Sequence, residues 1–143
     1  MQKSSAWDRH VALLTSSVVS GGAILNLPAQ TEGPAHAKSS ILSQKGLSMR
    51  LPEANTLVEA VMDGKVHRDY LTVGGAQYLV TTVTEAAYYG KCTSSSAASG
   101  IIAVKTRRVL VLATYTEPVV AAEAIPYVHR FADELDAKIG ELV

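Results

Sequence analysis

The sequence predicts an α+β fold in which a central antiparallel sheet lies between helices. Apolar side chains recur at helical spacing in residues 4–16 and again in the tail from residue 122. Between these segments, residues 66–115 contain several short stretches that are rich in β-branched and aromatic residues and separated by short turns. Strands joined by such short turns must be antiparallel, because parallel neighbours need a long crossover. We therefore expect the two terminal helices to pack together against one face of the sheet.

The N-terminal part of the chain begins with a helix and a strand. We expect the helix over residues 4–16, and the Ser-Gly-Gly sequence at 20–22 ends it. The sequence "AILNL" at 23–27 follows as a strand. Residues 28–50 are rich in Pro, Gly, Ser, Ala and Lys and show little periodicity, which predicts a long loop with at most one short strand around residues 40–43.

A second helix precedes the main part of the sheet. It is expected over residues 51–63, because Pro52 suits its first turn and Gly64 stops it. The strands that follow are "HRDYLTV", "AQYLVTTV", "AAYYGK", "GIIAVK" and "VLVLATY". The last of these does not alternate between polar and apolar residues, which predicts a strand that is covered on both faces.

The C-terminal tail carries the strongest helical pattern. Its apolar residues recur at intervals of three and four, with acidic residues between them. Pro126 lacks a backbone N–H and would break the interior of a helix. The helix is therefore expected to begin within one turn of this proline, near Ala122 or Glu123.

The composition limits the class of protein. A chain of 143 residues is long enough for one domain, expected to span residues 1–143, that buries its core without covalent cross-links. Cys92 is the single cysteine, so no internal disulfide framework exists and a reducing, cytoplasmic location is expected. The longest purely apolar run, residues 109–113, is far too short to cross a bilayer.

Residues 88–106 combine a Gly-Lys pair, the cysteine and a serine run, which suggests three kinds of chemistry. A phosphate loop needs a glycine where Glu85 stands, and a helix after the loop, but a strand is predicted there. A cysteine nucleophile needs a base, and no histidine has a spacing that pairs it with Cys92. No His or Cys pair has the spacing of metal ligands. We therefore expect no enzyme activity, metal or cofactor, and interpret residues 92–99 as a flexible hairpin loop.

Basic side chains flank this loop in the sequence, at Lys91, Lys105, Arg107 and Arg108. Because the net charge of the chain is zero, a local basic patch indicates one acidic partner surface rather than general binding of nucleic acid. A solvated strand edge explains the same charges equally well. The residues alone leave these two interpretations open.

Taken together, these segments resemble the profilin family. The sequences "YYGK", "GIIAVKT", "VLVLATYTEPV" and "VHRFADEL" follow the family's pattern in order and spacing, without a gap from residue 100 to residue 135. The N-terminal "AWDRHV" looks like the family's Ser-Trp-x-x-Tyr-Val, and "AILNL" follows it at nearly the family's distance. The resemblance covers most of the chain and implies the same fold, a central antiparallel sheet between helices.

The resemblance also implies a function. Members of the family bind monomeric actin one-to-one and regulate its polymerisation, often alongside proline-rich proteins such as formins and acidic phosphoinositides, in the cytoplasm and at the cytoskeleton. Two basic strands are suited to an acidic protein surface, where charges at the rim set rate and register. Carried over by position, the actin-binding residues are Tyr89, Lys91, Lys105, Arg107, Glu117, Val119 and Glu123.

The chain departs from the family in its loops and in its proline-rich ligand site. The loop at 92–99 and the segment at 28–50 are both longer than in the family, and either insertion could lie near the actin surface. Family members bind polyproline across aromatic side chains between the terminal helices. Here the second tryptophan is absent, and the positions that correspond to the site are Trp7, His10, Glu134 and Ile139.

The loss of rings predicts a change in ligand binding. Each well-placed aromatic ring contributes roughly 1 kcal/mol, so a site that loses most of its rings loses most of its affinity. Polyproline binding is therefore expected to be weak, altered or absent. Trp7 is then interpreted as a core residue that clamps the two terminal helices.

Two other classes of function are weighed against actin binding. A lipid-surface or scaffold module with the same fold would place the basic cluster on anionic headgroups. The zero net charge and the absence of an amphipathic basic helix argue mildly against it. A small hydrolase using Cys92 is the least favoured class, because no base can be identified.

Overall fold

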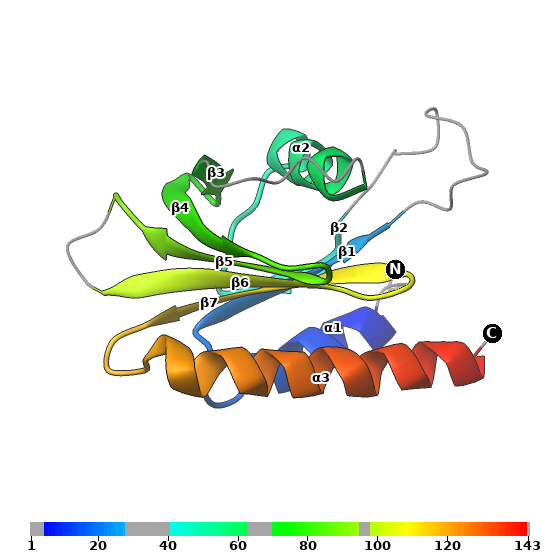
Figure 1. The fold of residues 1–143 in the computed structure, drawn as a ribbon. Coiled ribbons are helices and arrows are strands. Elements are labelled where there is room, and N and C mark those ends of the chain that lie inside the picture. Colours follow the sequence, from blue (N-terminus) through cyan, green and yellow to red (C-terminus); the bar gives the residue numbers. More distant parts are fainter. Residues whose placement is uncertain (1–4, 28–40, 63–69, 95–97, 143) are drawn as a thin grey trace.

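The computed structural model describes residues 5–27, 41–62, 70–94 and 98–142, and it shows a seven-stranded sheet with helices on both faces (Figure 1). Every pair of neighbouring strands is antiparallel, as the short turns predicted. The order across the sheet is β2-β1-β7-β6-β5-β4-β3, so the last strand of the chain lies beside the first. The strands are β1 (Gly21–Asn26), β2 (Ile41–Lys45), β3 (Tyr70–Val73), β4 (Ala76–Val83), β5 (Ala87–Cys92), β6 (Ser99–Lys105) and β7 (Val109–Thr116).

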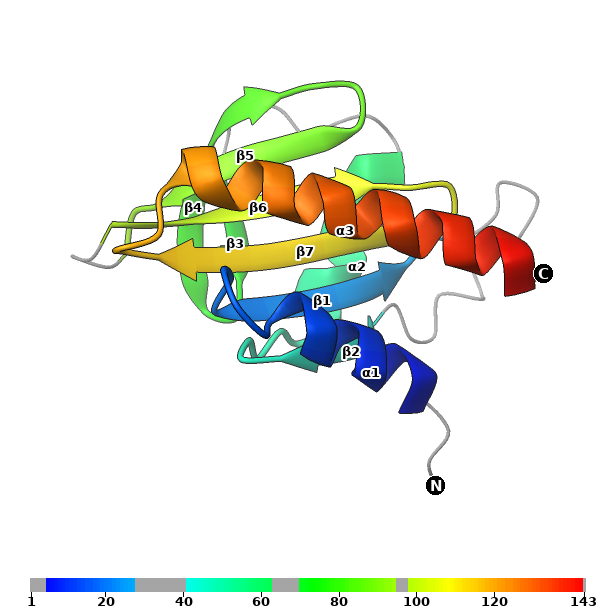
Figure 2. The same ribbon diagram turned by 90° about the horizontal axis from the view of Figure 1, so that it is seen from below.

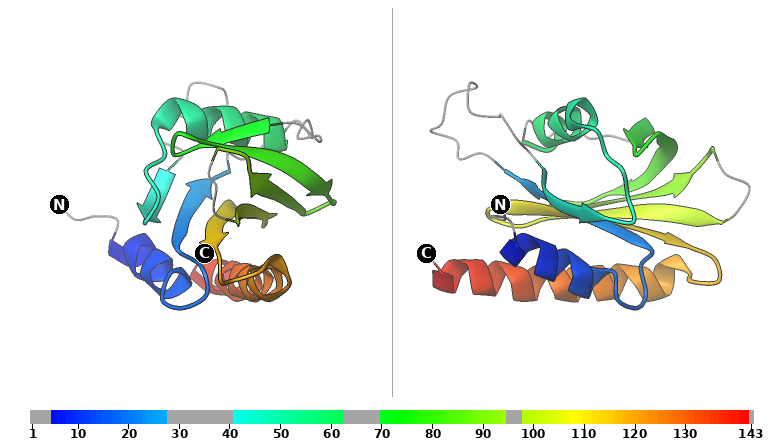
Figure 3. Two further views of the ribbon diagram at one scale, coloured as in Figure 1. Left: turned by 90° about the vertical axis from the view of Figure 1, so that its left-hand side faces the viewer. Right: turned by 180° about the vertical axis from the view of Figure 1, so that it is seen from behind.

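The helices divide between the two faces of the sheet. Helices α1 (Ser5–Leu14) and α3 (Ala121–Leu142) lie side by side on one face, and α2 (Leu51–Met62) covers the other (Figures 2 and 3). Each face has its own hydrophobic core, because alternate side chains of the same strands point in opposite directions. The predicted fold class is confirmed, including the packing of both terminal helices on one face.

Strand β7 holds the two cores together. Every residue from 109 to 115 is buried, with Leu110 and Leu112 on the α2 side and Val111 and Ala113 on the side of α1 and α3. The strand lies between β1 and β6, so both of its edges are also paired. The run without alternation in "VLVLATY" thus reflects a strand that is covered on both faces, as predicted.

Helix α3 begins at Ala121, one residue before the earlier of the two predicted starts, Ala122 and Glu123. Pro126 is the sixth residue of the helix, so it lies in the second turn, inside the helix rather than within its first turn. The helix is started by the carbonyl oxygen of Val120, which accepts the N–H groups of Glu123 and Ala124, both at 3.0 Å. Ala124, Val128 and Leu135 of the predicted apolar stripe are buried.

Several element boundaries differ from the prediction by a few residues. The first helix is shorter than 4–16, and the second ends at Met62 rather than residue 63. Cys92 and Ser99 end the two strands of their hairpin, so the loop is shorter than 92–99 by one residue at each end. Residues 41–45 of the predicted 28–50 loop form β2, and residues 28–40 lie outside the described residues.

Candidate functional site

One candidate surface lies where the β5–β6 hairpin meets the start of α3. Lys91 is exposed near the end of β5, and Glu123 is exposed in the first turn of α3. Between them, Glu117 fixes the base of the hairpin, because its N–H donates to the carbonyl oxygen of Ala98 at 2.7 Å and its Oε1 accepts the N–H of Ala98 at 3.2 Å. Val119 packs partly into the core beside α3. We call this region the hairpin end; it brings together four of the residues predicted to bind actin.

An exposed apolar residue adds to the hairpin end. Val120, which the sequence analysis did not single out, is 57% exposed directly before α3. An exposed apolar side chain offers area that a protein partner can remove from water. Its exposure depends on the start of α3, and no local sequence pattern marks that orientation.

Tyr89 connects β5 to the middle of α3. Its hydroxyl lies 2.6 Å from Nε2 of His129, and the two rings meet edge to face with their centroids 6.0 Å apart. Burial raises the pKa of Tyr89, so the hydroxyl keeps its proton at neutral pH and can donate it to the imidazole. The pair therefore fixes the position of β5 relative to α3. The sequence analysis did not identify His129 as the partner of Tyr89, because 40 residues separate the two in sequence.

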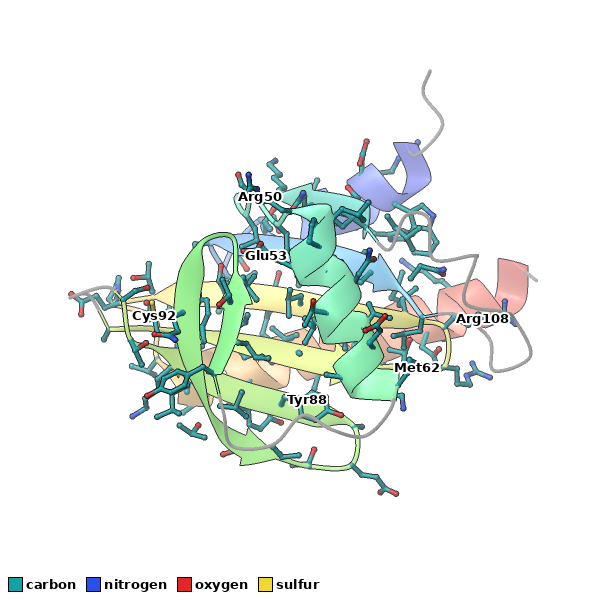
Figure 4. The ribbon with its side chains drawn as sticks, turned by 90° about the horizontal axis from the view of Figure 1, so that it is seen from above. Arg50, Glu53, Met62, Tyr88, Cys92 and Arg108 are labelled. Carbon is teal, nitrogen blue, oxygen red and sulfur yellow. The ribbon has the colours of Figure 1, made fainter. Side chains whose placement is uncertain are left out.

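Lys105 and Arg107 lie away from the hairpin end. Lys91 pairs with Gly100 in the β5–β6 ladder, and Lys105 follows Gly100 by five residues, which places the two lysines roughly 16 Å apart along the strands. Alternation also puts Lys105 on the α2 side of the sheet. Figure 4 shows the same separation, with Cys92 and Arg108 at opposite ends of the molecule. The basic patch suggested by the sequence is therefore divided in two.

One of these two distant basic residues, Arg107, forms an ion pair. Arg107 Nε donates to Asp136 Oδ2 of α3 at 3.1 Å, and the arginine side chain remains 71% exposed. Because the pair is open to solvent, it contributes little to stability. It does tie the β6–β7 turn to the helix.

A groove runs between α1 and α3. Its volume is about 280 Å³, and its walls come from both terminal helices. The hydroxyl of Tyr127 joins these helices by donating to the carbonyl oxygen of Leu14 at 2.8 Å, with that of Leu13 at 3.3 Å. The side chains that line the groove are His10, Leu13, Tyr127, Arg130, Phe131, Glu134, Leu135 and Lys138.

The groove contains two of the four residues assigned to the degenerate polyproline site. His10 and Glu134 line it, and Trp7 is partly buried beside His10, with ring centroids 6.1 Å apart. The side chain of Ile139 lies outside the described part of the structure. The sequence analysis missed two rings, those of Tyr127 and Phe131. A helical wheel drawn together with α1 would have been needed to find them.

Electrostatics distinguish the His10 side of the groove. Burial lowers the pKa of His10, and the nearby charges of Lys138 and Arg9 lower it further. The imidazole is therefore neutral at physiological pH. The two cations that contribute to the shift come from both helices, Arg9 from α1 and Lys138 from α3.

The loop after Cys92, which the sequence analysis compared with a phosphate loop, is followed by strand β6 rather than by a helix, as predicted. Cys92 Sγ lies 3.6 Å from Ser94 Oγ at the start of the loop. Within the described residues, no three His, Cys, Asp or Glu side chains gather in the way a metal site requires. None of the described helices is long and apolar enough to span a bilayer.

Comparison with known proteins agrees with this architecture. The family model for profilin matches residues 5–139. The chain belongs to the profilin family. Among solved structures, profilin IA of Acanthamoeba castellanii superposes with a TM-score of 0.74 at 21% identity, covering 92% of this chain and 98% of that one. The profilin of Schizosaccharomyces pombe gives 0.69 at 20% identity, covering 90% and 95%.

A further profilin structure includes a partner. LokiProfilin1 in its complex with rabbit actin gives a TM-score of 0.69 at 14% identity, covering 96% of this chain and 98% of that one. The search of curated proteins found no match. At these identities the structural likeness shows the profilin fold, while membership of the family rests on the match of the family model.

Proposed function

We propose that this profilin binds monomeric actin one-to-one and regulates actin polymerisation in the cytoplasm, without enzymatic activity. The observation that carries the proposal is the profilin family match over residues 5–139. Two related profilins that share the fold, LokiProfilin1 and LokiProfilin2, have been solved as complexes with rabbit actin.

The hairpin end is the surface that we assign to actin. It presents a cation at Lys91, acids at Glu117 and Glu123, and the exposed apolar side chain of Val120. This composition supports a protein contact, in which Val120 adds apolar area and the charges set rate and register. Tyr89 supports the surface from below by holding β5 against α3. Lys105 and Arg107, which the family pattern also indicates, would need a contact that extends to the far end of the sheet.

The experiment is calorimetric titration into monomeric actin with two charge reversals compared. We expect one-to-one binding in the micromolar range. Lys91→Glu should weaken it by about tenfold, because it reverses a charge within the contact. Lys105→Glu makes the same chemical change on the other face and tests whether the contact extends to the far end of the sheet.

Each outcome of this titration has a clear meaning. Weakening by Lys105→Glu alone would move the actin surface to the β6–β7 turn. No binding by folded protein would reject actin as the partner. A lipid-surface role is favoured only by the exposed cations at Arg107 and Arg108. Salt-sensitive binding to phosphoinositide vesicles, lost in a double Arg107→Glu/Arg108→Glu variant, would support that alternative.

We also propose that polyproline, and with it formin-type ligands, binds weakly or not at all. The support is the charged composition of the groove, where Arg130, Glu134 and Lys138 stand among the aromatic side chains. The hydroxyl of Tyr127 is already used to hold α1. Because Trp7 is the single tryptophan and lies beside His10, titration with oligoproline can be followed by its fluorescence. A saturable change at micromolar peptide would contradict this proposal.

A further inference from the structure

The α3 wall of the groove carries a regular series of charges. Arg130, Glu134 and Lys138 are spaced by four residues, so they project from the same side of the helix about 6 Å apart. They alternate as positive, negative and positive. A ligand lying along the helix would meet cations at both ends of this series and one anion between them.

The rest of the groove is mostly apolar, lined by leucines and aromatic rings. Leu13 of α1 is 55% exposed. It faces the groove together with Phe131 and Leu135 of α3. The volume of about 280 Å³ is below the ~300–1,000 Å³ of pockets that enclose a drug-sized ligand. The groove is thus suited to one or two side chains of a longer ligand.

Among the side chains that line the groove, cations outnumber anions. Two cations and one anion line the groove, and Arg9 adds a further cation close to His10. Two nearby acids have partners of their own. Asp136 accepts a hydrogen bond from Arg107, and Asp8 accepts one from the hydroxyl of Ser43. Asp133 is exposed and does not line the groove. Among the side chains that the structure describes, Arg130 and Lys138 form no ion pair.

We propose that this groove binds an acidic segment of a partner protein that carries an apolar side chain. The apolar side chain packs against Leu13 and Phe131, and flanking carboxylates meet Arg130 and Lys138. Glu134 selects against basic segments, since a lysine-rich ligand would gain one contact and face two repulsions. An extended segment fits better than a membrane surface, because the apolar contact lies between two helices rather than at a flat face. The inference does not depend on actin binding.

The test uses the full chain and fluorescence anisotropy of three short labelled peptides. The first alternates acidic residues with leucines, the second replaces each acid with lysine, and the third is oligoproline. We expect the acidic peptide to bind about tenfold more tightly than either of the others, and its affinity to fall as salt rises. Vesicles containing phosphoinositides are titrated in parallel.

Variants assign the binding to the groove. Lys138→Glu and, separately, Arg130→Glu should each weaken the acidic peptide by about tenfold, whereas Glu134→Gln should strengthen it. Lys91→Glu, the same charge change at the hairpin end, is the matched control and should leave the affinity unchanged. Circular dichroism confirms that each variant is folded; because the substituted side chains are exposed, the fold should be retained.

Several results would overturn the inference. Equal or tighter binding of oligoproline would show that the rings rather than the charges select the ligand. Binding that Lys138→Glu and Arg130→Glu do not weaken would place the acidic peptide elsewhere. Binding of vesicles without the acidic peptide would identify a lipid ligand instead. Failure of all three peptides to bind would reject the groove as a peptide site, with no bearing on the actin titration.

Discussion

At the residue scale, the missing side chain of Gly100 determines how closely β5, β6 and β7 pack. Gly100 lies opposite Tyr115 in the β6–β7 ladder. A Cβ at this position would stand 2.5 Å from the hydroxyl oxygen of Tyr115 and 2.6 Å from the carbonyl oxygen of Gly90. The second contact is with backbone that is hydrogen-bonded into β5, so it cannot move without disturbing the sheet. The position of the Tyr115 ring therefore requires a glycine at position 100.

Replacing Gly100 with alanine should destabilise the protein through this clash. We expect Gly100→Ala to lower the free energy of unfolding by about 1–3 kcal/mol, the usual range for an overpacked site. Urea denaturation measures the change. Ser99→Ala, one position earlier on the same strand, is the control and should stay within about 0.5 kcal/mol of wild type. If Gly100→Ala is as stable as Ser99→Ala, the ring of Tyr115 does not lie against Gly100 in solution.

At the element scale, Glu53 joins α2 to the β3–β4 turn. Its Oε1 accepts the N–H of Arg50 at 3.1 Å, which caps the start of the helix, and the N–H of Gly74 at 3.0 Å. Its Oε2 accepts the N–H of Gly75 at 3.2 Å. Both turn glycines have positive φ, 61° and 82°, and this conformation directs their amides to one acceptor. One carboxylate thus holds a helix and a hairpin together (Figure 4).

The hydrogen bonds of Glu53 should make stability depend on pH in acid. Burial alone would raise the pKa of Glu53, but the backbone donors at Arg50, Gly74 and Gly75, helped by the Arg50 charge, outweigh burial and lower it. A lowered folded-state pKa means that the carboxylate stabilises the fold above its ordinary value of 4.5, and that this stabilisation is lost as pH falls through the folded-state pKa. The effect is therefore complete at neutral pH.

Glu53→Gln tests this link between the two elements. At neutral pH we expect the free energy of unfolding to fall by about 1–2 kcal/mol. Charged hydrogen bonds can contribute more than this, but exposure of the carboxylate to solvent weakens them. The difference from wild type should shrink as the pH is lowered in a series of urea denaturations. Glu59→Gln, an exposed position on the same helix, is the control. A difference that stays constant with pH would mean that the charge of Glu53 makes no contribution.

At the scale of the whole molecule, the sequence predicted those structural features that depend on local residue patterns and on the order of the elements along the chain. The absence of alternation in β7 indicated a doubly covered strand, which is confirmed. The position of Pro126 indicated the start of α3 to within two residues. The sequence could not show which side chains meet across the sheet. Lys91 and Lys105 are separated by the register of β5 on β6, which depends on how the hairpin loop closes. The groove likewise exists only when α1 and α3 dock together.

The same division applies to the candidate sites. Trp7, His10 and Glu134 were identified from the resemblance to profilins, and the structure brings these residues to one region. The rings of Tyr127 and Phe131 were overlooked, because their position on α3 has meaning only relative to α1. Which residues contact actin stays a prediction, and the titration with Lys91→Glu and Lys105→Glu tests it.

The attachment of α1 gives a prediction for the molecule as a whole. Strand β7 is buried on both faces and paired on both edges, so its amides should exchange with solvent only through global unfolding. Helix α1 lies at the periphery and is held in part by the Tyr127 hydroxyl, which donates to Leu14 at 2.8 Å. Its amides should therefore exchange through a local opening of lower free energy.

Tyr127→Phe removes only that hydroxyl, so it should act on α1 and leave the sheet intact. Losing one hydrogen bond of about 1 kcal/mol should speed amide exchange in α1 by about fivefold, with β7 unchanged. Hydrogen exchange followed by NMR measures both elements in one sample. Tyr89→Phe, which removes the hydroxyl that contacts His129, is the matched control and should affect β5 and α3 but not α1. If Tyr127→Phe accelerates α1 and β7 equally, the helix opens only with the sheet, and the groove between the terminal helices is as stable as the core beneath it.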